Sequence, residues 1–311
     1  MVDTALNPIG QKRMGLVAGW GRYPIVVAQA LKRQGYEVHC VGVKDHASPE
    51  LAGICDTFLP AGIGRMGAMI RYFRRQHCLE ATMAGKIHKA AVLFRRWGWL
   101  SHFPDLTTLR AIFPHFVSRT KDSRDDSLLT AVVDIFAQGG IRFAPATDFA
   151  PELLVKAGLM TRRRLTAAQQ KDIEFGWRMA KELGRLDIGQ TVVVKGQSVI
   201  AVEAVEGTDE CLRRAGQLCP QGGFVAVKVA KPQQDMRFDV PTVGLGTLET
   251  LSQAGGAVLA VEADKTILLD EPDFIATANR LGLCVLALRK DQTQCIDQGQ
   301  RKEQAASEEA A

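Results

Sequence analysis

The densest group of ligating side chains lies in residues 228–244, which read K-V-A-K-P-Q-Q-D-M-R-F-D-V-P-T-V-G. In an extended segment, alternation places Asp235, Arg237 and Asp239 on one side and the apolar residues between them on the other. Two carboxylates supply the oxygen ligands that Mg²⁺ or Mn²⁺ prefers. Charges that converge on one face resist burial unless they are paired or bound to a ligand. We therefore expect a metal or phosphate site here; the alternative is an edge strand with a salt bridge.

Cationic and amide side chains in the same stretch suit a phosphate ligand. Lys231 and Arg237 can offset the charge on phosphate oxygens. Lys228 and Gln233 accompany them in the same loop-like stretch. All four are candidate substrate-binding residues, and Asp235 and Asp239 are the candidate metal ligands.

Two shorter segments also carry ligating groups where a strand or loop passes into a helix. One contains Asp125 and Asp126, and the other contains Gly207, Thr208 and Asp209. Carboxylates and hydroxyls at a helix start often cap the helix and complement its dipole. Gly207 also permits a close approach of the backbone to a ligand. Capping and substrate binding are compatible, and we keep both interpretations for these five residues.

A glycine-rich turn, Gly19-x-Gly21, follows the first apolar run. Such a turn lets backbone N–H groups approach phosphate at a helix N-terminus. The dinucleotide fingerprint needs a third glycine, and Tyr23-Pro24 stands in its way. The turn therefore favours a mononucleotide or a sugar phosphate over NAD; a tight turn without a ligand is the alternative.

These groups need a scaffold, and the apolar pattern predicts alternating strands and helices. A strand at 14–18, a helix over about 24–34 and a strand at 36–43 form a βαβ opening, whose crossover should be right-handed. Helices over 66–76 and 127–138 and strands at 81–84 and 141–143 continue this pattern. The sequence predicts an N-terminal Rossmann-like, doubly wound α/β domain over residues 14–148.

The second half of the chain is richer in strands. Residues 149–168 are interpreted as a linker, and a helix over 169–183 precedes a hairpin at 191–203 that turns at Gly196-Gln197. Further strands are expected at 224–229, 257–262, 266–270 and 284–288, with helices at 245–254 and 272–281. These elements predict a C-terminal mixed α/β catalytic domain over 169–290, a ligand crevice between the domains and a disordered tail over 291–311.

Composition narrows the class of protein. Hydrophobic residues make up 46% of the 311 residues and charged residues 23%, as in ordinary globular proteins. No apolar run has the length of a membrane span, and the N-terminal residues lack the apolar block of a signal peptide. Seven cysteines without CxxC spacing argue against a disulfide framework or a zinc knuckle. We expect a cytoplasmic protein with reduced thiols.

The net charge of +5 is unevenly distributed. One basic cluster comprises Arg71, Arg74, Arg75, Lys86, Lys89, Arg95 and Arg96, and a second comprises Arg162, Arg163 and Arg164. Basic clusters suit an anionic ligand, an anionic membrane or nucleic acid. The sequence lacks RNP-like, helix-turn-helix and zinc-finger patterns, so nucleic acid is the least favoured partner. Lys86 joins the candidate substrate-binding residues.

At these motifs the sequence resembles the I-type UDP-2,3-diacylglucosamine pyrophosphatase family of lipid A biosynthesis. The resemblance runs from about Gly15 to Leu288. Its motifs are Leu16-Val-Ala-Gly19-x-Gly21 with Pro24, Ala84-Gly85, Asp125-Asp126-x-Leu-Leu129, Gly184-Arg-Leu-Asp-Ile-Gly-Gln190, Val202-Glu-Ala-x-Glu-Gly-Thr-Asp209 and Lys231-Pro-x-Gln-Asp-x-Arg-x-Asp-x-Pro241. The last two are specific in combination.

The resemblance implies a metal-assisted attack of water on the α-phosphorus of UDP-2,3-diacylglucosamine, giving UMP and 2,3-diacylglucosamine 1-phosphate (lipid X). It implies two α/β domains with the lipid product between them. It makes Asp239 the leading catalytic or metal-ligating candidate and Asp235 its companion. The Gly19–Gly21 turn, Asp125-Asp126, Thr208 and Lys231 would contact the substrate.

A pyrophosphatase of this kind is expected to need a metal cofactor and to work near a membrane. Mg²⁺ or Mn²⁺ would be the cofactor. The protein would work at the inner face of the inner membrane, where an anionic surface is a candidate partner, and a homodimer is a candidate assembly. The runner-up function is a non-catalytic sensor or scaffold that binds a nucleotide sugar, and an NAD-dependent oxidoreductase is third.

Overall fold

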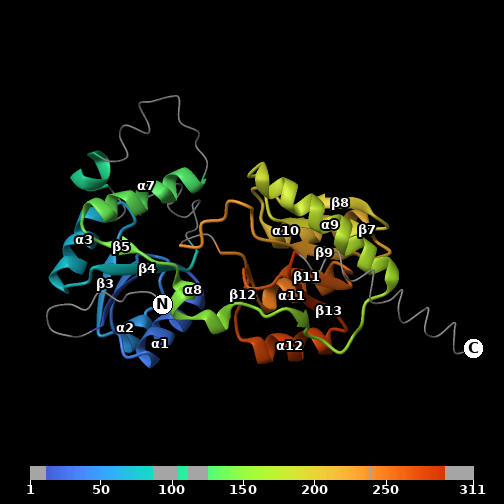
Figure 1. The fold of residues 1–311 in the computed structure, drawn as a ribbon, viewed down its shortest axis with the longest axis horizontal. Coiled ribbons are helices and arrows are strands. Elements are labelled where there is room, and N and C mark those ends of the chain that lie inside the picture. Colours follow the sequence, from blue (N-terminus) through green and yellow to red (C-terminus); the bar gives the residue numbers. More distant parts are fainter. Residues whose placement is uncertain (1–11, 87–103, 111–124, 238–239, 291–311) are drawn as a thin grey trace, which may run out of the picture. The chain divides into compact units, whose positions relative to one another are not determined.

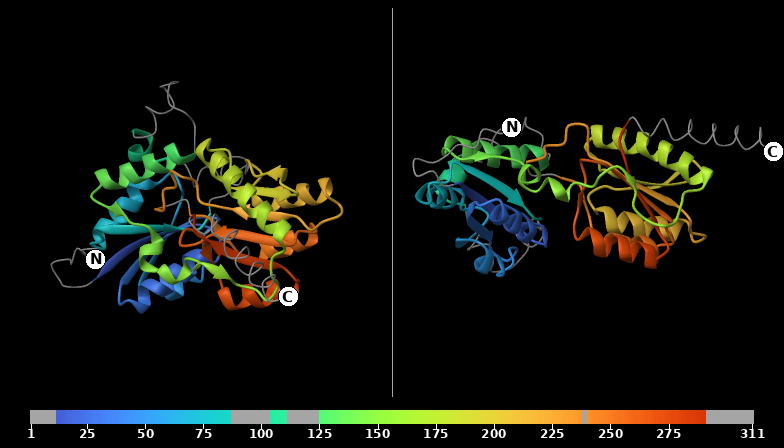
Figure 2. Two further views of the ribbon diagram at one scale, coloured as in Figure 1. Left: turned by 45° about the vertical axis from the view of Figure 1, so that its right-hand side comes forward. Right: turned by 60° about the horizontal axis from the view of Figure 1, so that its bottom comes forward.

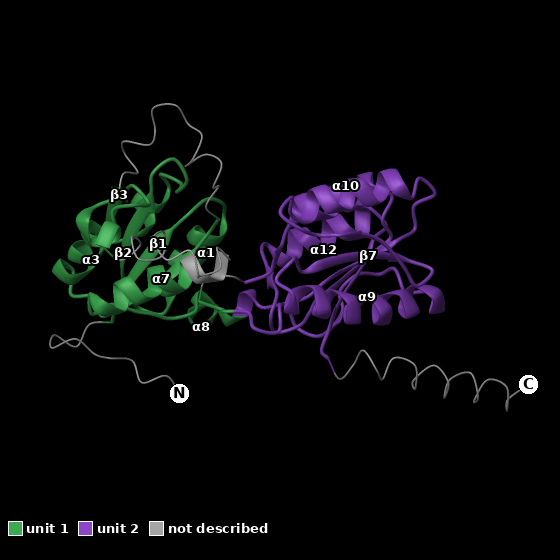
Figure 3. Cartoon of the chain, turned by 90° about the horizontal axis from the view of Figure 1, so that it is seen from above, with its two compact units in different colours: residues 1–151, 235–239 green, residues 152–234, 240–311 purple. Residues whose placement is uncertain are grey.

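The computed structural model describes residues 12–86, 104–110, 125–237 and 240–290; for residues 125–128 it describes the backbone alone (Figure 1). Asp239, the predicted tail and most of the basic aromatic segment 86–113 lie outside the described residues. The chain forms two compact units, shown in different colours in Figure 3. Unit 1 comprises residues 1–151 together with 235–239, and unit 2 comprises residues 152–234 and 240–311. The segment that carries Asp235 and Arg237 therefore belongs to unit 1, although unit 2 precedes and follows it.

Unit 1 is built on a parallel sheet. Its described strands have the order β3-β2-β1-β4-β5, and every pairing is parallel. The strands are β1 (Arg13–Ala18), β2 (Glu37–Val43), β3 (Thr57–Ala61), β4 (Glu80–Ala84) and β5 (Arg142–Phe143). The order reverses between β1 and β4, which makes the carboxyl ends of these two strands the topological switch point where α/β sheets bind ligands.

Helices cover both faces of this sheet, as expected when parallel strands are joined by crossovers. In Figure 1, α3 and α7 lie above the strands, and α1 and α2 lie below them. The helices are α1 (Tyr23–Arg33), α2 (Leu51–Ile54), α3 (Met66–Arg75), α7 (Asp125–Gln138) and α8 (Ala146–Phe149). In the core of this unit, the ring of Phe136 lies tilted against that of Phe73 and meets that of Phe143 edge to face. The prediction of a doubly wound N-terminal domain is confirmed.

Unit 2 holds a mixed sheet. Its described strands have the order β6-β13-β11-β9-β7-β8, in which β9, β11 and β13 are parallel and β6 and β7 are antiparallel to their neighbours. The strands are β6 (Gly158–Leu159), β7 (Thr191–Lys195), β8 (Ser198–Val202), β9 (Val225–Lys228), β11 (Val258–Glu262) and β13 (Cys284–Leu288). A short parallel pair, β10 (Thr242–Val243) and β12 (Ile267–Leu268), accompanies it. The prediction of a mixed C-terminal domain is confirmed.

The helices of unit 2 also form two layers. In the right-hand view of Figure 2, yellow-green α9 lies on one side of the sheet, and the orange and red helices lie on the other. The helices are α9 (Ala167–Arg185), α10 (Thr208–Leu218), α11 (Leu245–Gln253) and α12 (Glu271–Arg280), with a 3-10 turn, η1 (Pro151–Leu153), at the start of the unit. Thr166 and Gln169 form a capping box that fixes the start of α9. Gly176 lets α9 approach the sheet, because a Cβ atom there would lie 2.9 Å from Val227 Cγ2.

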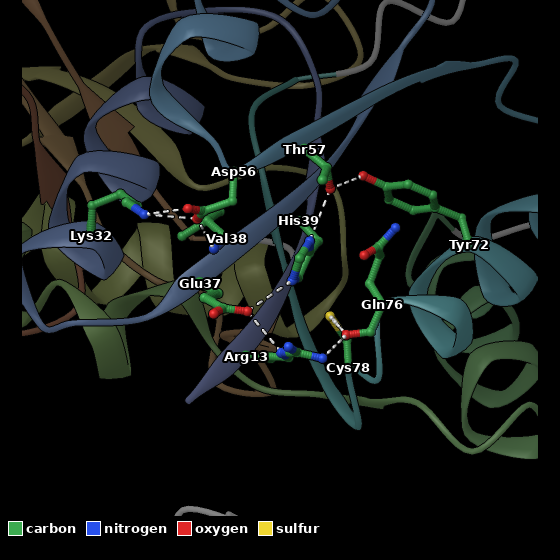
Figure 4. A network of polar contacts seen from close by, with 10 residues as sticks. All are labelled: Arg13, Lys32, Glu37, Val38, His39, Asp56, Thr57, Tyr72, Gln76 and Cys78. Carbon is green, nitrogen blue, oxygen red and sulfur yellow. Dashed lines mark hydrogen bonds and ion pairs between the residues drawn. The ribbon is translucent and has the colours of Figure 1, made fainter. Parts of the chain in front are cut away.

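A polar network holds the amino-terminal edge of the unit 1 sheet together (Figure 4). Arg13 Nε donates to Glu37 Oε2 at 2.8 Å, which joins β1 to β2. His39 Nδ1 lies 2.9 Å from Thr57 Oγ1, which joins β2 to β3. Burial lowers the pKa of His39, so it packs as a neutral ring. This edge is opposite to the switch point, and its contacts are those of a scaffold.

Candidate functional site

The carboxyl edge of the unit 2 sheet gathers charged side chains that are buried. β8, β9 and β11 run in the same direction, because β8 and β9 are both antiparallel to β7 and β9 is parallel to β11. Lys228 ends β9, Glu262 ends β11, and Glu203 follows β8 directly. All three are buried. Ligands of α/β sheets bind beyond the carboxyl ends of the strands, so this edge is the candidate site of unit 2.

Hydrogen bonds connect Lys228, Thr208 and Glu203 in a short chain. Lys228 Nζ donates to Thr208 Oγ1 at 2.7 Å, and Thr208 Oγ1 donates to Glu203 Oε1 at 2.9 Å. Lys228 Nζ also lies 3.8 Å from Glu203 Oε2. The structure thus brings together two residues predicted to bind substrate, Thr208 and Lys228, and adds a carboxylate that the sequence did not single out.

The N-terminus of α10, the positive end of its helix dipole, lies at the same place. Gly207 precedes the helix with a φ of +84°, which a residue with a side chain adopts only under strain. Thr208 and Asp209 are the first two residues of the helix, where backbone N–H groups lack intrahelical acceptors. Asp209 Oδ1 accepts a 3.4 Å hydrogen bond from Thr247 Oγ1 on α11, so its carboxylate supports the helix start. A helix start beside a buried ammonium suits phosphate oxygens.

The loop after β9 is anchored within unit 2 by its own polar side chains. Lys231 Nζ lies 2.7 Å from Asp187 Oδ1, and both side chains are largely buried. Gln233 Nε2 donates to the Gly184 carbonyl at 2.9 Å, and Lys231 N donates to Gln234 Oε1 at 2.7 Å. Lys231 and Gln233, predicted to bind substrate, thus hold the base of the loop in this structure.

Glu262 clamps the same loop from the end of β11. Its Oε2 accepts from Ala230 N at 2.8 Å and from Lys181 Nζ at 2.6 Å, and Lys265 Nζ lies 3.2 Å from Oε1. Burial lowers the pKa of Lys181, and the hydrogen bond to Glu262 opposes that shift. The anchored loop leads directly into the segment that carries Asp235 and Arg237.

Asp235 and Arg237 form an ion pair with each other. Arg237 Nε lies 2.9 Å from Asp235 Oδ1, and Nη2 lies 2.5 Å from Oδ2. The guanidinium holds the pKa of Asp235 below its usual range, and the carboxylate raises the pKa of Arg237, with a further contribution from Asp134. Among the described residues, no group of three or more Asp, Glu, His or Cys side chains is placed to hold a metal ion. Asp239 lies outside the described residues.

The glycine-rich turn of unit 1 lies at the switch point, against the end of β4. Gly19 N donates to the Ala84 carbonyl at 2.8 Å, and Trp20 and Lys86 exchange two backbone hydrogen bonds of 2.8 and 3.0 Å. The N–H groups of Gly19 and Trp20 are therefore occupied. Gly21 has a φ of +104°, and a Cβ atom there would meet nothing within 4 Å. Gly19, Gly21 and Lys86, predicted separately, thus lie in one place. α7 begins at Asp125, and the side chains of Asp125 and Asp126 lie outside the described residues.

Comparison with known proteins decides the family. A family model described as the LpxI N-terminal domain matches residues 13–153, and one described as the LpxI C-terminal domain matches residues 156–286. The UDP-2,3-diacylglucosamine pyrophosphatase LpxI of Caulobacter vibrioides is 31% identical over 286 residues, which cover 89% of this chain and 98% of that protein. This chain belongs to the LpxI family.

Membership in the LpxI family confirms the resemblance that the motifs indicated and the two-domain α/β fold. The catalytic, substrate-binding and metal-ligating assignments of single residues stay predictions. So does the ligand crevice between the two domains. Among the described residues, no helix is both long and apolar enough to cross a lipid bilayer.

The sequence analysis did not select four residues that support the candidate site of this LpxI family member. They are Lys181, Asp187, Glu203 and Glu262. Glu203 and Glu262 had a signal: each is an acidic residue directly after four or more apolar strand residues, at the edge where α/β sheets bind ligands. Asp187 lies within the Gly184–Gln190 motif, but nothing in that motif indicated its ion pair with Lys231. Lys181 had no signal, because only the packing of α9 against the sheet brings it to the loop.

Proposed function

We propose that this protein hydrolyses the diphosphate of UDP-2,3-diacylglucosamine in lipid A biosynthesis. Water attacks the α-phosphorus, the bond between this phosphorus and the bridging oxygen breaks, and the products are UMP and 2,3-diacylglucosamine 1-phosphate. The observation that carries the proposal is the match to both LpxI domains and to a relative of that activity along almost its whole length.

The described residues support a phosphate-handling role. Lys228 presents a buried cation beside the N-terminus of α10, and both favour the negative charge that phosphate oxygens carry. Groups fixed in advance around such charge lower the barrier to phosphoryl transfer, because they need no rearrangement during the reaction. In this proposal Lys228, Gly207 and Thr208 bind phosphate, and Lys231, Gln233 and Glu262 hold the loop that leads to Asp235 and Asp239.

Dependence on Mg²⁺ or Mn²⁺ is part of the proposal. A bound divalent ion would neutralise diphosphate oxygens and lower the pKa of a water ligand. Asp235 is engaged by Arg237 in this structure, and the described residues alone form no metal site, so we derive no reaction step through a metal. EDTA should abolish turnover, and Mg²⁺ or Mn²⁺ should restore it. Full turnover in a metal-free preparation would remove the metal from the proposal.

Association with the inner membrane surface is also part of the proposal, because the substrate carries two acyl chains. A helical turn over residues 106–110 packs on the start of α3 through Asp105, whose Oδ2 accepts from Ala68 N at 3.0 Å. This turn exposes 72% of Leu106 and 46% of Leu109. Arg71, Arg74 and Arg75 of α3 are exposed, and Arg71 is near enough to Asp105 to help lower the pKa of that carboxyl. Exposed apolar and cationic side chains on the same unit suit an anionic lipid surface.

One assay separates the proposed hydrolase from its alternatives. Purified protein is incubated with UDP-2,3-diacylglucosamine, and release of UMP is measured with and without divalent metal. Binding without UMP release would favour a nucleotide-sugar sensor or scaffold. Retained nicotinamide absorbance would favour an oxidoreductase, for which the occupied N–H groups of Gly19 and Trp20 give no support. Light scattering tests the proposed homodimer.

A further inference from the structure

Glu203 is placed to control two residues that the proposed function uses. It is 8% exposed and lies between the end of β8 and the start of α10. Its Oε1 accepts a hydrogen bond from Thr208, and its Oε2 lies 3.8 Å from Lys228 Nζ. Among the described residues, Oε2 has no hydrogen-bond partner. The carboxylate therefore acts on Lys228 through its charge and on Thr208 through a direct bond.

The single proton of the Thr208 hydroxyl determines which way the hydrogen bonds among Lys228, Thr208 and Glu203 run. A threonine hydroxyl has one proton, and Thr208 gives it to Glu203 Oε1. The same hydroxyl accepts from Lys228 Nζ. It has no proton left for a phosphate oxygen, so Thr208 can donate to substrate only through its backbone N–H. The positive partner for a phosphate at this place is the ammonium of Lys228.

Burying a Lys–Glu pair costs free energy, because both charges lose their hydration. Apolar side chains of similar size often stabilise a fold as much as such a pair, or more. An incompletely hydrogen-bonded carboxylate within such a pair calls for a reason other than stability. Lys228 lies at the carboxyl edge of the sheet, where α/β proteins bind ligands. A counter-ion that keeps this lysine charged while it is removed from water supplies that reason.

We propose that Glu203 is a positioning residue for the hydrolysis: it does not touch the substrate, but holds Lys228 charged and Thr208 oriented so that they receive the diphosphate. This inference rests on the proposed function. It differs from the roles expected of Asp235 and Asp239, because Glu203 acts through another side chain.

The pH dependence of turnover tests this role, since Glu203→Gln keeps the shape of the side chain but removes its charge. Without the carboxylate, the buried ammonium loses the negative charge of Glu203 beside it, and we expect it to give up its proton at lower pH. Cys211 on α10 also lies near Lys228, and burial raises the pKa of Cys211 to about 12, so it stays neutral. Residues opposite Lys228 on β7 and β11 are Thr191 and Val261, which do not ionise.

The experiment measures kcat/KM for UDP-2,3-diacylglucosamine between about pH 6 and pH 10. We expect Glu203→Gln to lower kcat/KM about tenfold at neutral pH and to move its alkaline limb down by roughly one pH unit or more. In the double variant Glu203→Gln/Lys228→Arg the alkaline limb should return toward that of wild type, because arginine stays protonated. Glu182→Gln, which removes an exposed carboxylate paired with Arg185 on α9, is the matched control and should follow wild type.

Thr208→Val provides a second test should Glu203→Gln fail to fold. It removes the hydroxyl to which Lys228 donates and leaves both charges in place, so the alkaline limb should move in the same direction by a smaller amount. A lower melting temperature with a pH profile parallel to wild type, in either variant, overturns the inference and leaves the proposed function intact. A wild-type protein that does not release UMP overturns the proposed function, and this inference with it.

Discussion

The backbone of Gly19 passes directly against the carbonyl oxygen of Lys86: a Cβ atom at position 19 would lie 2.7 Å from that oxygen. The contact holds the turn after β1 against the turn after β4, at the switch point of the unit 1 sheet. Gly19 is therefore required for packing in this structure, whereas a Cβ atom at Gly21 would meet nothing within 4 Å.

Gly19→Ala should therefore destabilise unit 1. Backbone lies against backbone here, so neither partner can rotate away, and we expect a loss of about 1–3 kcal/mol in the free energy of unfolding. Gly53→Ala is the matched control, because Gly53 is in α2 and a Cβ atom there would meet nothing within 4 Å. That change should be neutral or stabilising by about 0.5–1 kcal/mol. Denaturant melts of the three proteins measure both effects, and equal losses in the two variants would contradict the packing argument.

The ion pair between Asp235 and Arg237 should make stability depend on pH at acidic values. The pKa of Asp235 is lowered in the fold, so its contribution is fully present above the pKa of the unfolded chain, about 3.9. The contribution is lost as the pH falls through the lower folded value. Because both side chains are partly exposed, the effect should be about 1 kcal/mol or less.

Melting curves of wild type and Asp235→Asn test this expectation. The difference in melting temperature should be constant above about pH 5 and should vanish on acidification below the folded pKa of Asp235. A Lys32→Gln variant, which breaks the exposed pair with Asp56, is a control for a carboxylate whose pKa is also lowered. A difference for Asp235→Asn that grows as the pH falls would show that the pair does not form in solution.

Much of the scaffold could be predicted from the sequence, because buried strands and amphipathic helices leave regular apolar patterns. β11 was expected at 257–262 and spans Val258–Glu262, and α9 was expected at 169–183 and spans Ala167–Arg185. β3 was missed because it is a partly exposed edge strand that contains Pro60, and proline argues against a strand unless the strand is at an edge. α2 was missed because four residues are too few to show a helical period.

For the candidate site, the sequence indicated which residue types could bind substrate, but not which of these residues contact one another. Thr208 and Lys228 were expected to bind substrate, yet the hydrogen bond between them depends on the pairing of strands far apart in the chain. Lys231 was expected to face the substrate, and only the fold shows Asp187 beside it. The signal at Glu203 was not specific, because a charged residue at the end of an apolar strand is also typical of a strand that simply reaches solvent.

Membrane association should depend on the exposed leucines of residues 106–110 and the exposed arginines of α3. We expect binding to vesicles that contain phosphatidylglycerol, weak binding to neutral phosphatidylcholine vesicles, and a loss of binding as salt is raised. Leu106→Ser and Arg75→Glu should each weaken binding, by about 1 kcal/mol for each basic residue removed from the surface. Leu218→Ser, at an exposed leucine in unit 2, is the control. Equal binding of all variants in a flotation assay would place the lipid-binding surface elsewhere.

Asp239→Asn should separate chemistry from folding, because it keeps the size of the side chain and removes the charge that would hold a metal ion or orient water. If that charge stabilises the transition state, kcat should fall by roughly a hundredfold to a thousandfold while the substrate still binds. A residue that only formed a surface ion pair would change stability by about 0–1 kcal/mol and leave turnover nearly unchanged. Single-turnover release of UMP, measured beside a melting curve, distinguishes the two. Near-normal turnover in the folded variant would move the catalytic assignment to Asp235, and then to Asp125 or Asp126.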